Sequence, residues 1–157
     1  YGFEFDFSAK PNENWLFSLN GSVSSSTLFD VRNANGFTAD REMPINPRRT
    51  LAASVAYETP AFGDKKMGFE LSGRARSYFY NNPGNYSASR VPGYAIANAR
   101  LFIADQDGKW EGSLSVKNLL DKRYTTSVFL LGAGIANTRY GFYGRPRWVS
   151  AELSYNF

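Results

Sequence analysis

The sequence alternates between apolar and polar residues from its first position. In residues 1–9, four aromatic side chains and one alanine occupy the odd positions, and polar or small residues occupy the even ones. Successive side chains of a β-strand point to opposite faces, so a period of two predicts a strand with one apolar and one polar face. The pattern returns in residues 15–24, 49–58, 67–80, 94–104, 110–118 and 147–157. No segment has the periodicity of a helix, so the sequence predicts an all-β, antiparallel fold of about seven strands.

The connections between these segments alternate in length. Short turns join strands one and two, three and four, and five and six, and Asp107-Gly108 in the last of these is typical of a tight hairpin. The other connections, residues 31–48, 81–93 and 122–146, are long and rich in Asn, Gly, Pro and Tyr, and we expect them to be irregular. Outer-membrane barrels have short periplasmic turns and long extracellular loops. We therefore predict a segment of an antiparallel, up-and-down transmembrane β-barrel.

Aromatic residues gather at one end of the apolar face. They lie close to a short turn or to the C-terminus: Phe7, Trp15, Tyr57, Phe69, Trp110, Tyr155 and Phe157. Aromatic girdles of this kind lie at the headgroup boundaries of membrane barrels, whereas the middle of the same strands carries aliphatic residues. The alternative is that aromatic residues simply suit strands. Sorting of the rings to one end favours a membrane girdle.

Composition excludes most catalytic chemistry. The 157 residues include no His and no Cys, which excludes a Ser-His-Asp triad, a Cys nucleophile, a disulfide, and thiolate or imidazole zinc ligands. The longest apolar run, residues 128–136, is far shorter than the roughly 20 residues of a spanning helix. The net charge of +4 is scattered, which disfavours nucleic-acid binding. We expect no enzyme activity, no cofactor and no metal, since Asp105-x-Asp107-Gly108 lacks the later ligands of a calcium loop.

An odd strand number indicates an incomplete barrel. Bacterial single-chain barrels have an even number of strands, and a closed barrel leaves no edge in lipid. The chain also begins at Tyr1 without an initiating Met. We therefore expect residues 1–157 to be part of a longer protein.

The last third of the chain resembles TonB-dependent outer-membrane receptors. Three features carry the resemblance: Val116-Lys117-Asn118-Leu119-Leu120-Asp121-Lys122-Arg123-Tyr124, Gly144-Arg145-Pro146-Arg147, and the alternating strand that ends in Phe157. The resemblance implies a barrel of about 22 strands closed by an N-terminal plug, of which this chain is the last part. It implies that the plug and the energy-coupling segment, the TonB box, are absent from residues 1–157.

The resemblance also implies a function and partners. The function is active uptake of a scarce ligand, such as an iron-siderophore, a cobalamin or a glycan, across the outer membrane of a Gram-negative cell. The partners are outer-membrane lipid and lipopolysaccharide, the rest of the barrel, the plug, TonB through the missing N-terminal part, and the barrel-assembly machinery. That machinery would read the terminal strand at Val149, Ala151, Leu153, Tyr155 and Phe157.

Candidate ligand contacts come from the polar face and the long connections. The polar face offers Arg74, Arg76 and Arg100, and the connections offer Tyr86, Arg90, Arg139 and Tyr140. Guanidinium groups bind carboxylate, phosphate and catecholate oxygens, and aromatic rings stack on ligands. The competing interpretation is structural: Arg74 or Arg76 would form an ion pair with Glu111 or another acid, and loop rings would pack on one another. Arg147 falls on the apolar face at the loop end, where a lipopolysaccharide phosphate is its expected partner.

Two other functions fit the same alternation. A smaller outer-membrane barrel, a porin or an adhesin, would have a passive or structural role. A soluble β-sheet binding module would bury its apolar face and remain monomeric in buffer without detergent. A plug domain preceding Tyr1 would favour the receptor over the smaller barrel.

Overall fold

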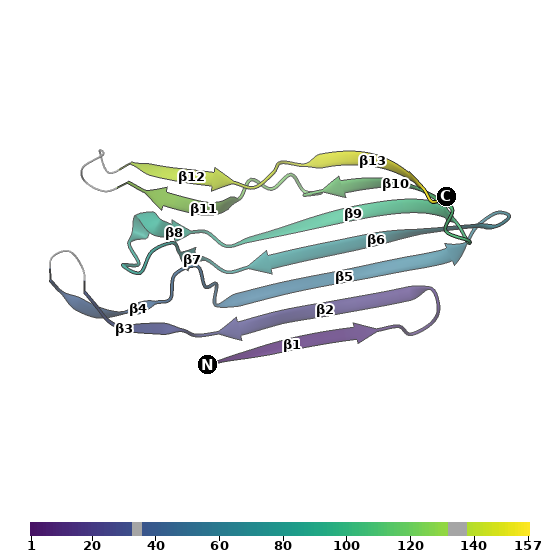
Figure 1. Ribbon diagram of the computed structural model, residues 1–157. Helices are drawn as coiled ribbons and strands as arrows, with labels where there is room; N and C mark the ends of the chain where they lie inside the picture. Colours follow the sequence, from purple (N-terminus) through teal and green to yellow (C-terminus); the bar gives the residue numbers. More distant parts are fainter. Residues whose placement is uncertain (33–35, 132–137) are drawn as a thin grey trace.

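The computed structural model describes residues 1–32, 36–131 and 138–157, and its main feature is one seven-stranded sheet (Figure 1). The strands are β1 (Gly2–Ala9), β2 (Trp15–Ser24), β5 (Arg49–Pro60), β6 (Lys65–Arg76), β9 (Tyr94–Asp105), β10 (Trp110–Lys117) and β13 (Trp148–Tyr155). They pair antiparallel in chain order, β1-β2-β5-β6-β9-β10-β13. The predicted all-β, antiparallel, seven-stranded fold is confirmed.

The strand register aligns apolar residues with apolar residues across the sheet. One row runs Phe7, Leu19, Ala53, Gly73 and Ala97 across five strands. The row one position along is polar and runs Ser8, Ser18, Ser54, Ser72 and Asn98. Because a slip of one residue would bring polar side chains onto the apolar face, the alternation in the sequence also determines the pairing.

No described segment of the chain covers the apolar face of the sheet. Large hydrophobic side chains on it are exposed, among them Phe7, Leu71, Leu101 and Leu153, and Leu153 is 78% exposed. A face of this size without a protein layer requires an apolar environment outside the chain. In the part of the chain that the structure describes, no helix combines the length and the hydropathy needed to cross a membrane.

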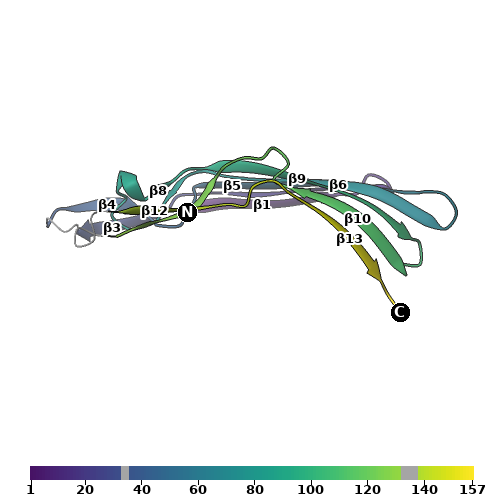
Figure 2. The same cartoon turned by 90° about the horizontal axis from the view of Figure 1, so that it is seen from above.

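The sheet is curved rather than flat. Seen from above, β10 and β13 bend away from the central strands toward the C-terminus (Figure 2). Twist and curvature of this kind are what a sheet needs to form part of a barrel wall. β1 and β13 are the two edges of the sheet.

The long connections are not irregular, as the sequence suggested, but fold into hairpins beyond the main sheet (Figure 1). They form β3 (Thr27–Arg32) with β4 (Thr38–Glu42), β7 (Phe79–Tyr80) with β8 (Arg90–Val91), and β11 (Thr125–Leu130) with β12 (Arg139–Tyr143). The predicted strand 67–80 is likewise two strands, β6 and β7. A 3-10 helix, Ser87–Ser89, precedes β8. These strands were missed because they are short and because β3–β4 and β11–β12 contain register shifts, which weaken a period of two.

A small core joins two of the hairpins. Phe79 of β7, Val91 of β8 and Val128 of β11 are buried together. Val91 and Val128 are almost completely inaccessible. The core therefore positions β11–β12 against β7–β8 above the loop end of the main sheet.

An ionic cluster joins two short turns at the opposite end. The Lys65 ammonium donates to Asp105 and, at 2.8 Å, to Asp64, and it lies 5.1 Å from the centre of the Trp110 ring. The backbone N–H of Gln106 also donates to the carbonyl oxygen of Asp64 at 2.9 Å. These contacts tie the β5–β6 turn to the β9–β10 turn.

The Asp64 carboxylate should stabilise the folded chain while it is ionised and lose this effect when it is protonated at acidic pH. The hydrogen bond and charge of Lys65 lower the pKa of the Asp64 carboxyl below its ordinary value. Its contribution is therefore complete above the unfolded pKa of about 3.9 and is lost as the pH falls through the lower, folded pKa. Asp64→Asn should lose less stability than the wild type between pH 7 and pH 3, as measured by denaturant midpoints. Asp107→Asn, in the neighbouring turn, is the matched control and should behave like the wild type.

Candidate ligand-binding face

Some cations of the polar face are held by protein partners, and others have no ion-pair partner among the residues that the structure describes. Arg100 of β9 forms an ion pair with Glu111 of β10, and its guanidinium lies 5.1 Å from the centre of the Phe102 ring. The sequence offered Arg74 or Arg76 as the partner of Glu111, and the structure places Arg100 there instead. Arg100 is thus occupied within the sheet.

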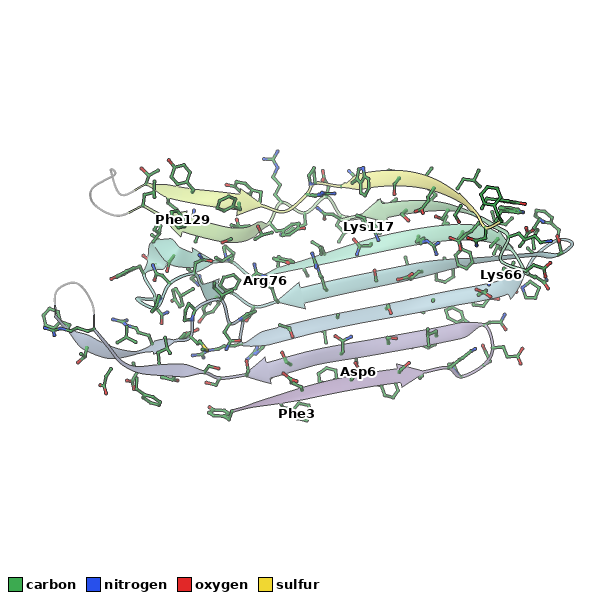
Figure 3. The ribbon with its side chains drawn as sticks, viewed as in Figure 1. Phe3, Asp6, Lys66, Arg76, Lys117 and Phe129 are labelled. Carbon is green, nitrogen blue, oxygen red and sulfur yellow. The ribbon has the colours of Figure 1, made fainter. Side chains whose placement is uncertain are left out.

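Arg76 is held at the junction between the main sheet and the hairpins (Figure 3). Its Nη2 donates to the carbonyl oxygens of Thr125 and Thr126 at 3.2 and 3.4 Å. Its guanidinium lies over the rings of Phe79 and Tyr94 at 4.4 and 4.6 Å, and its Nη1 is buried. Arg76 therefore fastens β11 to β6 and is poorly placed to meet a ligand.

A hollow of about 530 Å³ opens on the polar face near the loop end of the sheet. Three exposed cations line it, Arg74 of β6, Lys117 of β10 and Arg145 before β13. Three rings also line it, those of Tyr124, Tyr143 and Trp148. Its remaining lining residues are Ile96, Asn98, Asn118, Thr126, Gly144 and Pro146. Among the described residues no acid lines the hollow, so it suits an anionic ligand that carries rings or apolar groups.

Asn118 holds the wall of this hollow together. Its side chain is 3% exposed, and its Nδ2 donates to the carbonyl oxygens of Lys122 and Arg145, both at 3.0 Å. Its Oδ1 accepts from the Lys122 N–H at 2.9 Å, and its own N–H donates to Asn98 Oδ1 at 3.0 Å. The motif that carried the family resemblance is therefore a clamp that joins β9, β10 and the approach to β13.

Asp121 completes the clamp. Its Oδ1 accepts from the Arg147 N–H at 2.8 Å, and its Oδ2 lies 3.9 Å from the Arg147 guanidinium. Asn118 and Asp121 both have a positive φ, of 53° and 50°. Asn and Asp tolerate this left-handed conformation better than other residues with a side chain. The backbone therefore explains both residue types.

The candidate residues of the connections lie on the hairpins rather than in the hollow. Arg90 stacks over the Tyr78 ring at 4.1 Å, and Arg139 Nε donates to the Ala88 carbonyl oxygen at 2.9 Å. Tyr86 and Tyr140 are both half-exposed. The structure thus brings Arg139 to the 3-10 segment and leaves both tyrosine rings accessible at the loop end.

The residues expected to contact the membrane all lie on the apolar face. Trp15 is 4.7 Å from Tyr57 and 6.0 Å from Phe69 between ring centres, Trp110 pairs with Tyr155, and Tyr155 is 5.2 Å from Phe157. Val149, Ala151 and Leu153 follow the same face of β13. Their membrane and assembly roles remain predictions.

Sequence reasoning missed the three wall residues Tyr124, Arg145 and Trp148. Trp148 could have been found, because it shares the phase of the polar residues Ser150 and Glu152 on β13. Tyr124 and Arg145 lie in connections, where no period indicates a face. The clamp around Asn118 brings Arg145 to the sheet, and the Tyr124 ring contacts the Tyr94 ring of β9, with 4.4 Å between ring centres.

Comparison with known proteins agrees with this architecture. The family model for the TonB dependent receptor-like β-barrel matches residues 1–119. A comparison with curated proteins finds no match. The match supports the receptor over the smaller barrel and the soluble module.

Two solved structures share the fold. The ferric yersiniabactin uptake receptor FyuA from Yersinia pestis superposes with a TM-score of 0.83 at 20% identity, over 99% of this chain and 23% of that one. The siderophore receptor PiuA from Acinetobacter baumannii superposes with a TM-score of 0.66 at 19% identity, over 97% of this chain and 21% of that one. The chain thus spans less than a quarter of the length of either receptor.

Proposed function

Because this chain belongs to the TonB-dependent receptor β-barrel family, we propose that it contributes barrel wall and extracellular hairpins to an outer-membrane receptor for energy-coupled uptake of a ligand. In this proposal residues 1–157 are the C-terminal part of the barrel of a Gram-negative cell. The plug and the segment that contacts TonB belong to other parts of the longer protein. The short turns and the C-terminus then face the periplasm, and the three hairpins face the medium.

The hollow beside Arg74 is the observation that carries the ligand proposal. Its three cations provide an excess of positive charge on the polar face, and its rings offer stacking surfaces. An iron-siderophore chelate with carboxylate, phenolate or catecholate oxygens matches that chemistry better than a neutral glycan. The names of FyuA and PiuA, both siderophore receptors, agree with this ligand class.

Ligand uptake through the hollow predicts a specific loss in charge variants. The full-length receptor would be the sole siderophore receptor of the test cells, which would be given ⁵⁵Fe complexes of a catecholate and of a phenolate–carboxylate chelator. Arg74→Gln combined with Lys117→Gln should weaken the apparent affinity by roughly a hundredfold or more, since each charged hydrogen bond contributes about 1.5–3 kcal/mol.

Lys66→Gln is the matched control. Lys66 also carries a positive charge but lies at the turn end of β6, where it pairs with Glu58 at 3.3 Å. Lys66→Gln should leave ⁵⁵Fe uptake unchanged. Equal uptake by the double variant and the wild type, at equal surface expression, would show that the ligand does not bind in the hollow.

A further inference from the structure

The apolar face contains a hollow of its own. It is open, has a volume of about 860 Å³ and extends over β1, β2, β5, β6 and β9, and Ala53, Gly73 and Ala97 form its floor. Larger side chains such as Leu19 and Leu71 rise around it. The small residues continue toward the loop end, where Ala75 pairs with Ala95. The hollow is an open apolar furrow of the kind that a hydrocarbon chain can fill.

A free cation lies on the same face at the loop end of β5. Arg49 pairs with Val23 in the register, and so belongs to the apolar face, and it is exposed. Its backbone is fixed by Ser77, whose Oγ accepts from the Arg49 N–H at 3.1 Å. Its neighbour Arg48, in contrast, forms an ion pair with Glu42 at 3.2 Å. Among the described residues no carboxylate pairs with the Arg49 guanidinium.

The depth of Arg49 matches a headgroup boundary. Eight residues separate Tyr57, at the turn end of β5, from Arg49, which is about 27 Å along a strand. With the tilt of 35–45° typical of membrane barrels, the two residues lie about 20 Å apart along the membrane normal, close to the height of the apolar band. Between the rows of Arg49 and Met67, the described positions of this face include no acidic residue. In the proposed orientation of the barrel, this boundary belongs to the outer leaflet.

We propose that Arg49 and the furrow below it bind one lipopolysaccharide molecule of the outer leaflet. The Arg49 guanidinium would bind a phosphate on the acylated glucosamine of the lipopolysaccharide. One acyl chain of the same molecule would lie along Ala75, Gly73 and Ala97. The same role predicted for Arg147 remains a prediction, and the Arg147 guanidinium, unlike that of Arg49, lies 3.9 Å from a carboxylate oxygen, Asp121 Oδ2. The site is separate from ligand uptake, and it rests on the proposed function in placing the apolar face in the outer membrane with the hairpins toward the medium.

Binding of labelled lipopolysaccharide to the purified full-length receptor in zwitterionic detergent tests the site. Arg49→Gln should weaken binding by roughly ten- to a hundredfold, as expected for loss of one charged hydrogen bond. Arg48→Gln changes the same residue type at the adjacent position on the opposite face and should leave the affinity unchanged. Equal affinities of Arg49→Gln and the wild type would overturn the proposal.

A second variant tests the furrow independently of charge. A Cβ at Gly73 would have the Ile96 carbonyl oxygen at 3.6 Å as its nearest contact, so a side chain fits there. Gly73→Leu should fill the furrow and weaken lipopolysaccharide binding while near-native circular dichroism shows an intact barrel. Unchanged lipopolysaccharide binding by Gly73→Leu would show that no acyl chain occupies the furrow. Equal binding of dephosphorylated lipopolysaccharide, or of phosphatidylglycerol, would overturn the assignment to lipopolysaccharide phosphate.

Discussion

Asn118→Ala should lower the free energy of unfolding by about 4 kcal/mol or more. The substitution leaves the Lys122 and Arg145 carbonyl oxygens and the Lys122 N–H without their partner in a buried site. An unsatisfied buried group costs about 1–3 kcal/mol, and alanine at the positive φ of this position adds about 1 kcal/mol. Guanidinium unfolding of the full-length receptor, followed by tryptophan fluorescence, measures the loss.

Two companion variants separate the causes. Asn118→Gly relieves the backbone strain but still lacks the hydrogen bonds, so it should recover about 1 kcal/mol relative to Asn118→Ala. Asn156→Ala removes one exposed hydrogen bond, from Nδ2 to the Gly108 carbonyl oxygen at 2.8 Å, and should cost less than about 1 kcal/mol. A loss below about 1 kcal/mol for Asn118→Ala would show that the clamp does not hold the barrel wall.

Gly68→Ala should also destabilise the sheet, by about 1–3 kcal/mol or more. Gly68 faces Phe102 across the β6–β9 pair, and the Phe102 ring lies over it. A Cβ at Gly68 would lie 2.2 Å from the Tyr57 carbonyl oxygen and 2.8 Å from the Phe102 ring. The Tyr57 carbonyl oxygen is a backbone atom, so rotation of a side chain cannot relieve this clash. β5 and β6 would have to separate locally.

Gly73→Ala provides the matched control on the same strand. Its Cβ would meet nothing closer than 3.6 Å, so only the general preference for or against glycine in a strand should change. Comparison of the two alanine variants in guanidinium therefore isolates the close approach at Gly68. Equal midpoints for the two variants would contradict the packing of Phe102 over Gly68.

Gly68 also explains an irregularity of the sequence pattern. Phe102 occupies the polar phase of β9, and Ile96 is a second apolar residue on that phase. Phe102 covers a position without a side chain and contacts the guanidinium of Arg100, and Ile96 is 7% exposed beside the hairpins. An aromatic ring that covers a glycine on the neighbouring strand is a recognised device for stabilising a sheet. Neither residue reverses the assignment of the faces.

The alternation in the sequence predicts which face of the sheet carries the cations of the candidate site, but not their partners. The phase of Arg74, Arg100 and Lys117 follows from alternation alone, and all three are on the polar face. The partners of these three cations do not follow from the alternation. Arg100 is paired because the register brings β10 beside it, and Arg76 is covered because β11 returns over β6, 49 residues later in the chain. Arg74 and Lys117 are exposed, and among the described residues neither has an ion-pair partner.

The sequence by itself determined the strands, their two faces and their pairing. Side-chain direction in a strand is a local property with a period of two, and matching apolar rows leave one favourable register. Only the tertiary structure decided which cations are available, how the three hairpins form, and that Asn118 and Tyr94 bring Arg145 and Tyr124 to the hollow that Arg74 lines. These contacts join segments distant in sequence, and hydrogen bonds between such segments have no periodic signal. The alternation defines the sheet, and the segments that fold back over its loop end define the site.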